Sequence, residues 1–393
     1  MSRSILFVDT YYFSLLQAHG LERRPVSSDS YADALDEALD IGFGTGGALS
    51  RNMRELGWDA TITIPNSLTL QSLWARDHGA RHPWGAGWAY GAHLARLPAA
   101  RNFLHRFPHL HGTLLEQIRR IRPDIVYVQD INLLPPALSK QIRRSTDLLV
   151  GEIASPLPPK PFLLAYDLIV SSLPSIVETA RSWGIPSEFV PLGFDERFAV
   201  PGPASKRPID ALFVGSFSRL QPQTIPLLQA VAERVPGLRI YGPAEAGVMQ
   251  KAGLHDHYVG AAWGREMFEL LGSSKLVVNR HGAIAGDFAV NMRMYETTGA
   301  GAALVTERKS NLAELFEPGT EVIAYSGIQD AAEQAAALLA DPARLDQVAA
   351  AGQARTLGQH SYRHRAAQLS ELLEKRLESA RSATAQTDAA PST

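Results

Sequence analysis

"VVNRHGAIAGDFAVNMRMYETTGAGAALVTE", residues 277–307, decides the fold because its pattern changes from strand to helix and back to strand. An apolar run begins it and a glycine-rich loop follows. The helical segment "FAVNMRMYETTG" then ends at Gly299, before the apolar run "AALVT". A strand, a crossover helix and a second strand make the βαβ unit of parallel sheets. The stretch therefore predicts an α/β protein.

The same alternation extends over most of the 393 residues. A stretch rich in proline and glycine interrupts it at 191–208 and indicates a linker. We therefore expect two Rossmann-like, doubly wound α/β domains that face each other across a cleft, since ligands of such sheets bind beyond the carboxyl ends of the strands. The expected segments are an N-terminal domain at 1–195, a linker at 196–208, a C-terminal domain at 209–378 whose last helix is able to pack back on the N-terminal domain, and a disordered tail at 379–393. The expected strands lie at 4–9, 59–64, 124–129, 147–152, 167–171, 188–191, 210–215, 238–242, 257–260, 276–279, 302–306 and 321–326.

The composition excludes several classes of protein. A formal net charge of −2 and a pI near 6.6 give no reason to expect a nucleic-acid partner. The absence of cysteine excludes disulfides, thiolate metal sites and cysteine nucleophiles. No secretory signal and no apolar window of membrane-spanning length is found, so a cytoplasmic protein is expected, with peripheral contact as the only membrane association considered. The basic runs at 119–122 and 140–144 are typical of solvated helix faces, and the oligomeric state is not predicted.

Polar residues at the end of the strand expected at 276–279 are the first candidates for a binding site. Asn279, Arg280 and His281 lead from it into the glycine-rich loop. The next helix is expected to start within 288–291, where amides without helical partners bind anions such as a diphosphate.

Arg293 and Glu296 lie in this helix. Arg293, like Arg280, is able to add a charge-assisted hydrogen bond to a diphosphate. Glu296 lies one to two turns into the helix, where a carboxylate can accept two hydroxyl groups of a ribose. Alternatively, the two residues form an ordinary i,i+3 ion pair on the helix surface. The sequence leaves both interpretations open.

The loop "VGSFSRLQPQT" at 214–224 follows the first strand of the same half. Gly215 permits close approach of a ligand to the backbone, and Ser216 and Arg219 are able to meet a phosphate. Tight packing of the strand against the next helix is the alternative explanation for the small residues.

A glycine-rich run, "LDIGFGTGGALSRNMRELGWDATITIPN" at 39–66, looks like a dinucleotide-binding turn. That motif needs a strand directly before its first glycine and an acid at the end of the second strand. Here a helical pattern precedes Gly42, and the second strand ends in Pro65 and Asn66. The glycines therefore indicate close approach of the backbone to some other group.

Asp130, at the end of "IVYVQD", is the candidate general base, because a strand-end carboxylate in the first domain points into the cleft. Capping of the following helix accounts equally well for this aspartate. Glu152 is a weaker candidate of the same kind. No metal is expected at His105, His109 and His111, because neither acids nor cysteines lie near them.

The C-terminal half contains, in this order, the motifs "LFVGS", "LRIYG", "EMFELLGSSKLVVNRHG", "NMRMYETTGAGAALVTE", "LAELFEPGTEVIAYSG" and "HSYRHRAAQL". Through these motifs it resembles the donor domain of GT-B glycosyltransferases, and within them the CgeB-like, group 1 family. The N-terminal half is similar to the acceptor domains of that family through "FGTGGALSRNMRELGWDA", "NSLTLQSLWARDHG" and "PDIVYVQDINLLP".

The resemblance implies a glycosyltransferase of hexosyltransferase type, as in polysaccharide biosynthesis. Such an enzyme moves a sugar from a nucleoside-diphosphate sugar to a hydroxyl of a glycan, a lipid-linked, a small-molecule or a protein acceptor. Glu296 would bind the ribose and Asn291 would lie near the diphosphate. The residues expected to flank the donor or to lie near the acceptor and donor phosphates are Gly215, Ser216, Arg219, Gly44, Thr45 and Gly46.

Related retaining enzymes have a second acid before this helix, and here the corresponding residue is Asp287. It is shorter than glutamate and lies one residue further from Glu296 than in those enzymes. The catalytic candidates are thus Asp130, Arg293 and Asp287, with retention as the expected outcome. Arginines and amides stabilise a leaving diphosphate without a metal, so no cofactor or metal ion is expected. The alternatives are a nucleotide-sugar epimerase of the same fold and an inactive nucleotide-sugar-binding protein.

Overall fold

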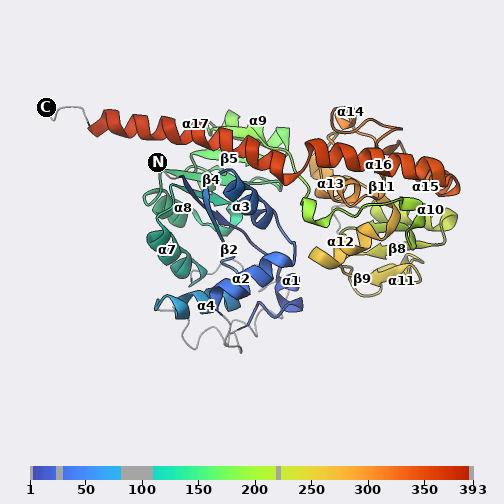
Figure 1. The fold of residues 1–393 in the computed structure, drawn as a ribbon, viewed down its shortest axis with the longest axis horizontal. Helices are drawn as coiled ribbons and strands as arrows, with labels where there is room; N and C mark the ends of the chain where they lie inside the picture. Colours follow the sequence, from blue (N-terminus) through green and yellow to red (C-terminus); the bar gives the residue numbers. More distant parts are fainter. Residues whose placement is uncertain (1–2, 24–29, 81–108, 218–222, 389–393) are drawn as a thin grey trace. The chain divides into compact units, whose positions relative to one another are not determined.

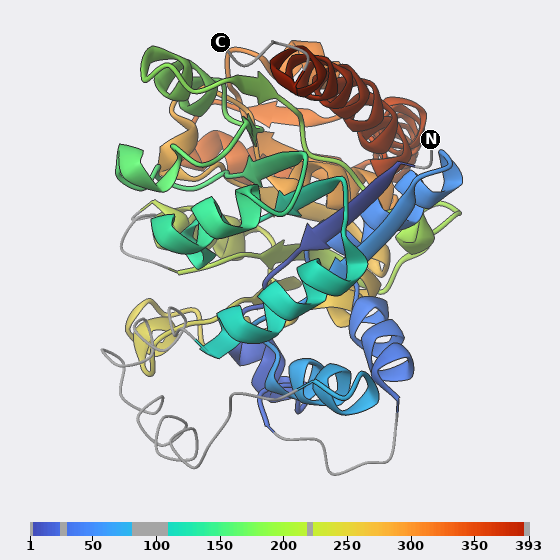
Figure 2. The same ribbon diagram turned by 90° about the vertical axis from the view of Figure 1, so that its left-hand side faces the viewer.

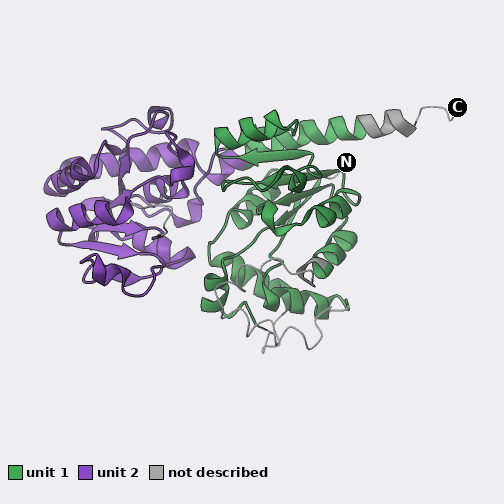
Figure 3. Ribbon diagram, turned by 180° about the vertical axis from the view of Figure 1, so that it is seen from behind, with its two compact units in different colours: residues 1–190, 366–393 green, residues 191–365 purple. Residues whose placement is uncertain are grey.

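The computed structural model describes residues 3–23, 30–80, 109–217 and 223–388 (Figure 1). The chain divides into two compact units (Figure 3), with Met1–Val190 and Ala366–Thr393 in unit 1 and Pro191–Arg365 in unit 2. Each unit is built around a parallel sheet of six strands with helices packed on it. This arrangement confirms the predicted α/β class.

The sheet of unit 1 has the strand order β2-β1-β3-β4-β5-β6. Its strands are nearly continuous apolar runs, such as "IVYV" in β3, because a sheet covered by helices buries both faces of each strand. In the register of the sheet, Ile5 of β1 lies between Ala60 of β2 and Ile125 of β3. The strands are β1 Ser4–Val8, β2 Asp59–Thr63, β3 Ile125–Val128, β4 Leu148–Glu152, β5 Leu168–Ser171 and β6 Ser187–Phe189. The helices are α1 Phe13–Ala18, α2 Tyr31–Asp40, α3 Gly46–Glu55, α4 Leu68–Asp77, α7 His109–Ile121, η1 Ile131–Leu133, α8 Pro136–Arg143, η2 Lys160–Phe162 and α9 Pro174–Ser182.

The last helix, α17 (Tyr362–Asp388), belongs to unit 1 from Ala366 onward. Its buried residues recur every three or four positions, which gives the helix one apolar face; they are Ala366, Leu369, Leu373 and Leu377. The indole Nε1 of Trp58 donates to Ser370 Oγ over 2.8 Å. Figures 1 and 2 show this helix, in red, beside the N-terminal end of the chain, where Arg3 pairs with Glu374.

The expectation of a disordered tail from residue 379 was wrong for residues 379–388, which continue α17. The segment "SARSATAQTD" contains neither glycine nor proline, so nothing in it ends a helix. Its composition looked unstructured because it is small and polar. Contacts with residues distant in sequence, made by Arg381, hold its first turn on unit 1.

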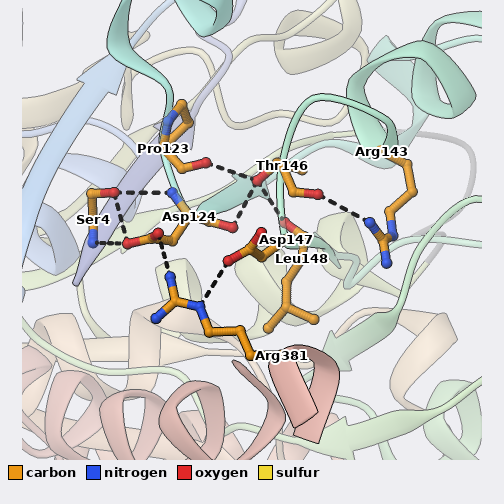
Figure 4. Close-up of polar contacts among 8 residues, drawn as sticks. All are labelled: Ser4, Pro123, Asp124, Arg143, Thr146, Asp147, Leu148 and Arg381. Carbon is orange, nitrogen blue, oxygen red and sulfur yellow. Dashed lines mark hydrogen bonds and ion pairs between the residues drawn. The ribbon is translucent and has the colours of Figure 1, made fainter. Parts of the chain in front are cut away.

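Arg381 ties the terminal helix to the start of two strands (Figure 4). Its Nε donates to Asp147 Oδ2 over 2.9 Å, and its Nη2 donates to Asp124 Oδ1. The other oxygen of Asp124 accepts the backbone N–H of Ser4 over 2.7 Å and the Ser4 hydroxyl over 2.9 Å. Asp124 therefore joins β1, β3 and α17 through one carboxylate.

The sheet of unit 2 has the order β12-β11-β10-β7-β8-β9. Alternate residues of its strands face opposite sides, as in β10, where Leu276 and Val278 pack in one apolar cluster and Val277 in the other. Helices α10, α15 and α16 contribute to the first cluster, and α12 and α13 to the second. The strands are β7 Ile209–Val214, β8 Leu238–Tyr241, β9 Tyr258–Gly260, β10 Ser274–Asn279, β11 Ala303–Glu307 and β12 Ile323–Tyr325. The helices are η3 Glu196–Phe198, η4 Ala204–Lys206, α10 Thr224–Arg234, α11 Val248–Lys251, α12 Gly264–Gly272, η5 Ala283–Ala285, α13 Met292–Gly299, α14 Leu312–Leu315, α15 Ile328–Ala340 and α16 Pro342–Gln359.

The stretch 196–208, expected as a linker, is instead a packed part of unit 2. Ala204 is buried in the core, and the Arg207 side chain donates to the carbonyls of Ser274 and Val200. The prolines and glycines of this stretch interrupt helices and strands, but the stretch still packs on the core of unit 2. The chain passes between the units at 190–191 and again at 365–366.

We expect Arg381→Ala to lower the free energy of unfolding of unit 1 by about 1 kcal/mol, because a partly exposed ion-pair network contributes only modestly. Chemical denaturation followed by circular dichroism measures the loss, which should shrink at high salt. Arg119→Ala is the control, since Arg119 makes an ion pair of 3.6 Å with Glu116 and is more exposed. An equal loss in both variants would contradict an anchoring role for Arg381.

Candidate functional site

Both sheets reverse their strand order at one point, between β1 and β3 in unit 1 and between β7 and β10 in unit 2. On either side of such a point the crossover connections lead in opposite directions, so the loops that follow the two central strands separate. The space at the carboxyl ends of these strands is where open α/β sheets bind ligands.

In unit 2, the predicted residues lie around the ends of β7 and β10. Gly215 and Ser216 follow β7, and the Gly215 N–H donates to Tyr241 O over 3.0 Å. Asn279 is the last residue of β10 and leads into Arg280 and His281. Arg219 lies outside the described residues, as do His105 and the side chains of His109 and His111.

Asn279 and Asn291 fix the start of α13 on the end of β10. The Asn291 amide donates to Asn279 Oδ1 and to the carbonyl of Arg280, each over 3.0 Å. Its oxygen accepts the N–H of Met294 over 3.2 Å and so caps the helix. The Asn279 amide in turn donates to Thr306 Oγ1 of β11 over 2.9 Å. Both asparagines thus support the loops of this site.

The helix begins later than the sequence predicted, at Met292 and not within 288–291. The Phe288 N–H donates to Ala285 O over 2.9 Å, and the Ala289 N–H donates to Asn311 Oδ1 over 2.6 Å. These two amides are therefore already engaged. The N–H groups of Met292 and Arg293, in the first turn of α13, have no carbonyl partner within the helix and point away from it.

Arg293 and Glu296 form the i,i+3 ion pair that was the alternative interpretation, but the pair is buried. Arg293 Nη1 lies 2.8 Å from Glu296 Oε2, and the side chains are 17% and 8% exposed. Arg293 Nε also donates to Val214 O at the end of β7 over 3.1 Å. Burial raises the pKa of Glu296, and the charge of Arg293 opposes that rise. The pair therefore lies at the point where the strand order reverses.

Arg280 differs from Arg293 in its contacts. Arg293 is engaged with Glu296, with Val214 O and with Met267 Sδ. Arg280 Nη1 is buried and has no hydrogen-bond partner within the described part of the chain. A buried guanidinium nitrogen without a partner is costly unless a ligand supplies an acceptor.

His281 lies beside this arginine and is nearly completely buried. Burial lowers the pKa of its imidazole to about 4, although the nearby Glu307 carboxylate opposes that shift. The ring is therefore neutral near pH 7. It can take part in hydrogen bonds but does not contribute a positive charge.

Asp287 is exposed and lies in the loop before α13. Its carbonyl accepts the N–H of Ser310 over 3.1 Å and the Ser310 hydroxyl over 2.6 Å. With Arg308 and Lys309 it lines an open hollow of about 510 Å³. The hollow is formed mainly by the segment after β11, with Asp287 as its contribution from the loop between β10 and α13.

In unit 1, the glycine loop approaches a carboxylate of its own chain. The N–H of Gly46 donates to Asp9 Oδ2 over 3.2 Å. Gly44 has a φ of +76°, and a Cβ there would lie 2.5 Å from the same oxygen. Gln129, at the end of β3, donates to Thr45 Oγ1. The close approach predicted from the glycines is therefore a contact with Asp9 and Gln129.

Asp9, which is buried, and Glu152, which is half-buried, lie within electrostatic reach of each other at these strand ends. Burial raises the pKa of Asp9 to about 7, although the N–H groups of Thr10 and Gly46 oppose the rise. Burial raises the pKa of Glu152 to about 7 as well, against a hydrogen bond of 3.0 Å from the Tyr127 hydroxyl. Both groups change charge near neutral pH.

Asp130 caps the short helix η1, since its Oδ1 accepts the Asn132 N–H over 3.0 Å. This contact is the capping alternative foreseen for Asp130, and it uses only one of the two carboxylate oxygens. Asp130 is half-buried, and its charge contributes to the raised pKa of Asp9. The sequence prediction overlooked Asp9 and Gln129, although both follow apolar strands directly, in "SILFVD" and "IVYVQD".

Within residues 3–23, 30–80, 109–217 and 223–388, no group of three or more His, Cys, Asp or Glu residues is arranged to hold a metal ion. None of the described helices is both long enough and apolar enough to cross a bilayer.

Comparison with known proteins matches the second unit to a family. Residues 223–371 match the family described as "Glycosyl transferase-like". No curated protein matches the chain significantly by sequence. The matched range includes the candidates from Asn279 to Glu296.

Several solved structures share the fold of nearly the whole chain. HepE from Anabaena, solved with UDP and glucose, is 13% identical, and the match covers 95% of this chain and 100% of HepE with a TM-score of 0.57. Sucrose-phosphate synthase from Thermosynechococcus elongatus is 14% identical, with 96% and 100% covered and a TM-score of 0.59. AviGT4, a glycosyltransferase involved in avilamycin A biosynthesis, is 16% identical, with 96% and 98% covered and a TM-score of 0.55. These similarities show that the two units have the fold of such proteins.

We expect Asp9→Asn to change the pH dependence of stability. The pKa of Asp9 in the folded chain, about 7, is above its ordinary value of 3.8. The folded state therefore binds the proton more tightly, and this contribution to stability is lost as pH rises from about 4 to about 7. Asparagine does not ionise, so the variant should gain roughly 2–4 kcal/mol relative to the native chain over that interval.

Denaturant unfolding at several pH values measures this difference. Asp59→Asn, which removes an exposed carboxylate from the same unit, gives the background. Parallel pH profiles of the native chain and Asp9→Asn would show that Asp9 ionises in the folded protein as it does in the unfolded one.

Proposed function

We propose that this chain, a glycosyltransferase of the GT-B fold, moves a sugar from a nucleoside-diphosphate sugar to an acceptor hydroxyl. The observation that carries the proposal is the buried Arg293–Glu296 pair at the strand reversal of unit 2, inside the range that matches the glycosyl transferase-like family. HepE, which shares the fold, was solved with UDP and also with UDP-glucose. A uridine diphosphate donor is therefore the first to be tested.

The nucleoside is proposed to bind through Glu296. A carboxylate accepts two hydroxyl groups at once, which suits the adjacent hydroxyls of a ribose. Arg293 would hold this carboxylate charged and oriented, since its guanidinium is engaged with Glu296 and with Val214 O. Arg293 is thus proposed as a positioning residue, in place of the catalytic role first expected for it.

The diphosphate is proposed to lie near Arg280. This arginine has a buried Nη1 without a partner in the described residues, and an anionic oxygen would supply the missing acceptor. The amides of Met292 and Arg293 at the start of α13 add donors that favour negative charge. Gly215 and Ser216, and Arg219 with them, are proposed to flank the same group.

Charge on the leaving diphosphate develops as the glycosidic bond breaks. Fixed donors that already point at this charge lower the barrier without reorganising. We therefore propose a reaction that needs no metal ion. On the resemblance to retaining enzymes, we propose also that it retains the anomeric configuration. Asp130 remains the proposed acceptor-side base, through the oxygen that does not cap η1. Asp287 remains a proposed contact of the transferred sugar. Gly44, Thr45 and Gly46 are proposed as neighbours of the acceptor and not of the phosphates, because Asp9, which accepts the N–H of Gly46, repels an anion when it is ionised.

We expect UDP to bind the native chain. We also expect two variants to lower the affinity for UDP but to differ in their effect on the affinity for uridine. Glu296→Gln should weaken both UDP and uridine about tenfold to a hundredfold, because a hydrogen bond to a charged group contributes roughly 1.5–3 kcal/mol. Arg280→Gln should weaken UDP by a similar factor but leave uridine unchanged, because uridine carries no phosphate. Isothermal titration and ligand-observed NMR measure the two ligands.

Glu333→Gln is the matched control, since Glu333 is 59% exposed and pairs with Arg234 on the surface. Circular dichroism checks that each variant is folded. Native binding of UDP by both variants would remove Glu296 and Arg280 from the site. Slow release of UDP from UDP-glucose supports a transferase, interconversion of nucleotide sugars would indicate an epimerase, and binding without turnover on any acceptor would indicate a binding protein.

A further inference from the structure

Tyr12, in the loop after β1, exposes 60% of its surface. Burial of an aromatic side chain stabilises a protein by a few kcal/mol, so an exposed ring forgoes that contribution. The other exposed aromatic side chain within the described ranges, Phe189, is 40% exposed and lies on the edge strand β6. Tyrosine is enriched at binding surfaces because it offers a rigid apolar face with a polar tip.

The backbone next to Tyr12 is fixed by two hydrogen bonds between Tyr11 and the side chain of Asn66. The Tyr11 N–H donates to Asn66 Oδ1 over 3.2 Å, and Asn66 Nδ2 donates to Tyr11 O over 2.7 Å. Tyr11 itself is buried, and its hydroxyl donates to Ala38 O over 3.1 Å. The loop is therefore fixed in a position that leaves the Tyr12 ring at the surface.

Phe43, from the glycine loop, supports the same ring. Its ring centroid lies 5.0 Å from that of Tyr12 at an interplanar angle of 64°, and 5.3 Å from that of Tyr11 at 76°. Edge-to-face contacts of this kind fix the orientation of a ring. Phe43 therefore helps to orient Tyr12, while 60% of the Tyr12 surface stays exposed.

Acidic residues lie near the start of this loop. Asp9 follows β1 directly, three residues before Tyr12, and Asp130 lies two residues beyond β3, the strand that pairs with β1. Partial burial, and then the negative charge of Asp130, raise the pKa of the Tyr12 hydroxyl, so the two side chains lie within electrostatic reach. One oxygen of Asp130 is used by Asn132. The other is able to accept a hydroxyl.

We propose that Tyr12 and Asp130 form a subsite for a neutral saccharide acceptor, with a sugar ring stacked on Tyr12 and one of its hydroxyls donating to Asp130. The C–H bonds on the face of a sugar ring are attracted to the negative face of an aromatic ring, and its hydroxyls are donors suited to a carboxylate. This subsite names the acceptor class and rests on the proposed transferase function.

Other ligands that stack on tyrosine fit this place less well than a neutral sugar does. Nucleotides and phosphorylated or acidic sugars carry negative charge, which the carboxylate of Asp130 repels, and Asp9 and Glu152 add to this repulsion as they ionise near neutral pH. A lipid chain needs a broad apolar surface and gives a carboxylate no hydrogen bond. A neutral sugar satisfies both the ring and the acid.

Binding of the full chain to an array of neutral and acidic hexose oligosaccharides tests this subsite without a donor. The native chain should bind neutral members, and the Kd of the best one, measured by ligand-observed NMR, should rise about tenfold in Tyr12→Ala. Tyr12→Phe keeps the ring and should stay within about twofold. Leu56→Ala, which removes an exposed apolar side chain at the end of α3, should match the native chain.

Three results would overturn the subsite: no neutral saccharide binds, Tyr12→Ala binds as tightly as the native chain, or acidic oligosaccharides bind better than neutral ones. UDP titrations of the same variants separate this inference from the proposed function. If the saccharide binds in a Tyr12-dependent manner and UDP does not bind, the subsite stands and the transferase function fails. If UDP binds and no saccharide does, the subsite fails and the proposed transferase function stands.

Discussion

The reversal of strand order in each parallel sheet is the constraint on which the rest of this chain depends. Right-handed crossovers that leave two neighbouring strands in opposite directions open a gap above the sheet. The gap exposes backbone carbonyls and amides that the sheet itself no longer pairs. In unit 2, Arg293 enters the gap and donates to Val214 O. In unit 1, Asp9 accepts the N–H of Gly46 there.

The two gaps differ in charge, and this difference suggests how the proposed reaction is divided. The gap of unit 2 contains two arginines, one buried acid and the start of a helix, a combination suited to an anion attached to a ribose. The gap of unit 1 contains Asp9, Asp130 and Glu152, which accept hydroxyl groups and repel anions when they are ionised. Each set of side chains is held by its own unit.

The sequence predicted the sheets well because a strand buried on both faces must be continuously apolar, and runs such as "LVVN" and "IVYV" show this directly. It predicted the start of α13 wrongly because "FAVN" has a helical composition, while the Ala289 N–H is taken by Asn311, 22 residues later. The tail at 379–388 was missed for a similar reason. Its helix is anchored by Asp124 and Asp147, more than 200 residues away.

The candidate site was predictable in its residues but not in their contacts. Strand-end positions identify Asn279, Arg280 and Asp130 from the pattern alone. Arg293 is engaged because it reaches Val214 O, while Nη1 of Arg280 has no partner among the described residues, and no local pattern encodes this difference. In the same way, the glycines at 44 and 46 indicated a close contact, but not that Asp9 supplies it.

Hydrogen–deuterium exchange of the full chain with and without UDP tests most directly whether the strand reversal of unit 2 binds the donor. Protection should appear in the loops after β7 and β10 and in the first turn of α13, at residues 214–217, 279–282 and 292–295. Unchanged exchange there, with protection confined to the hollow around Arg308–Ser310 or to unit 1, would contradict a donor site at this position.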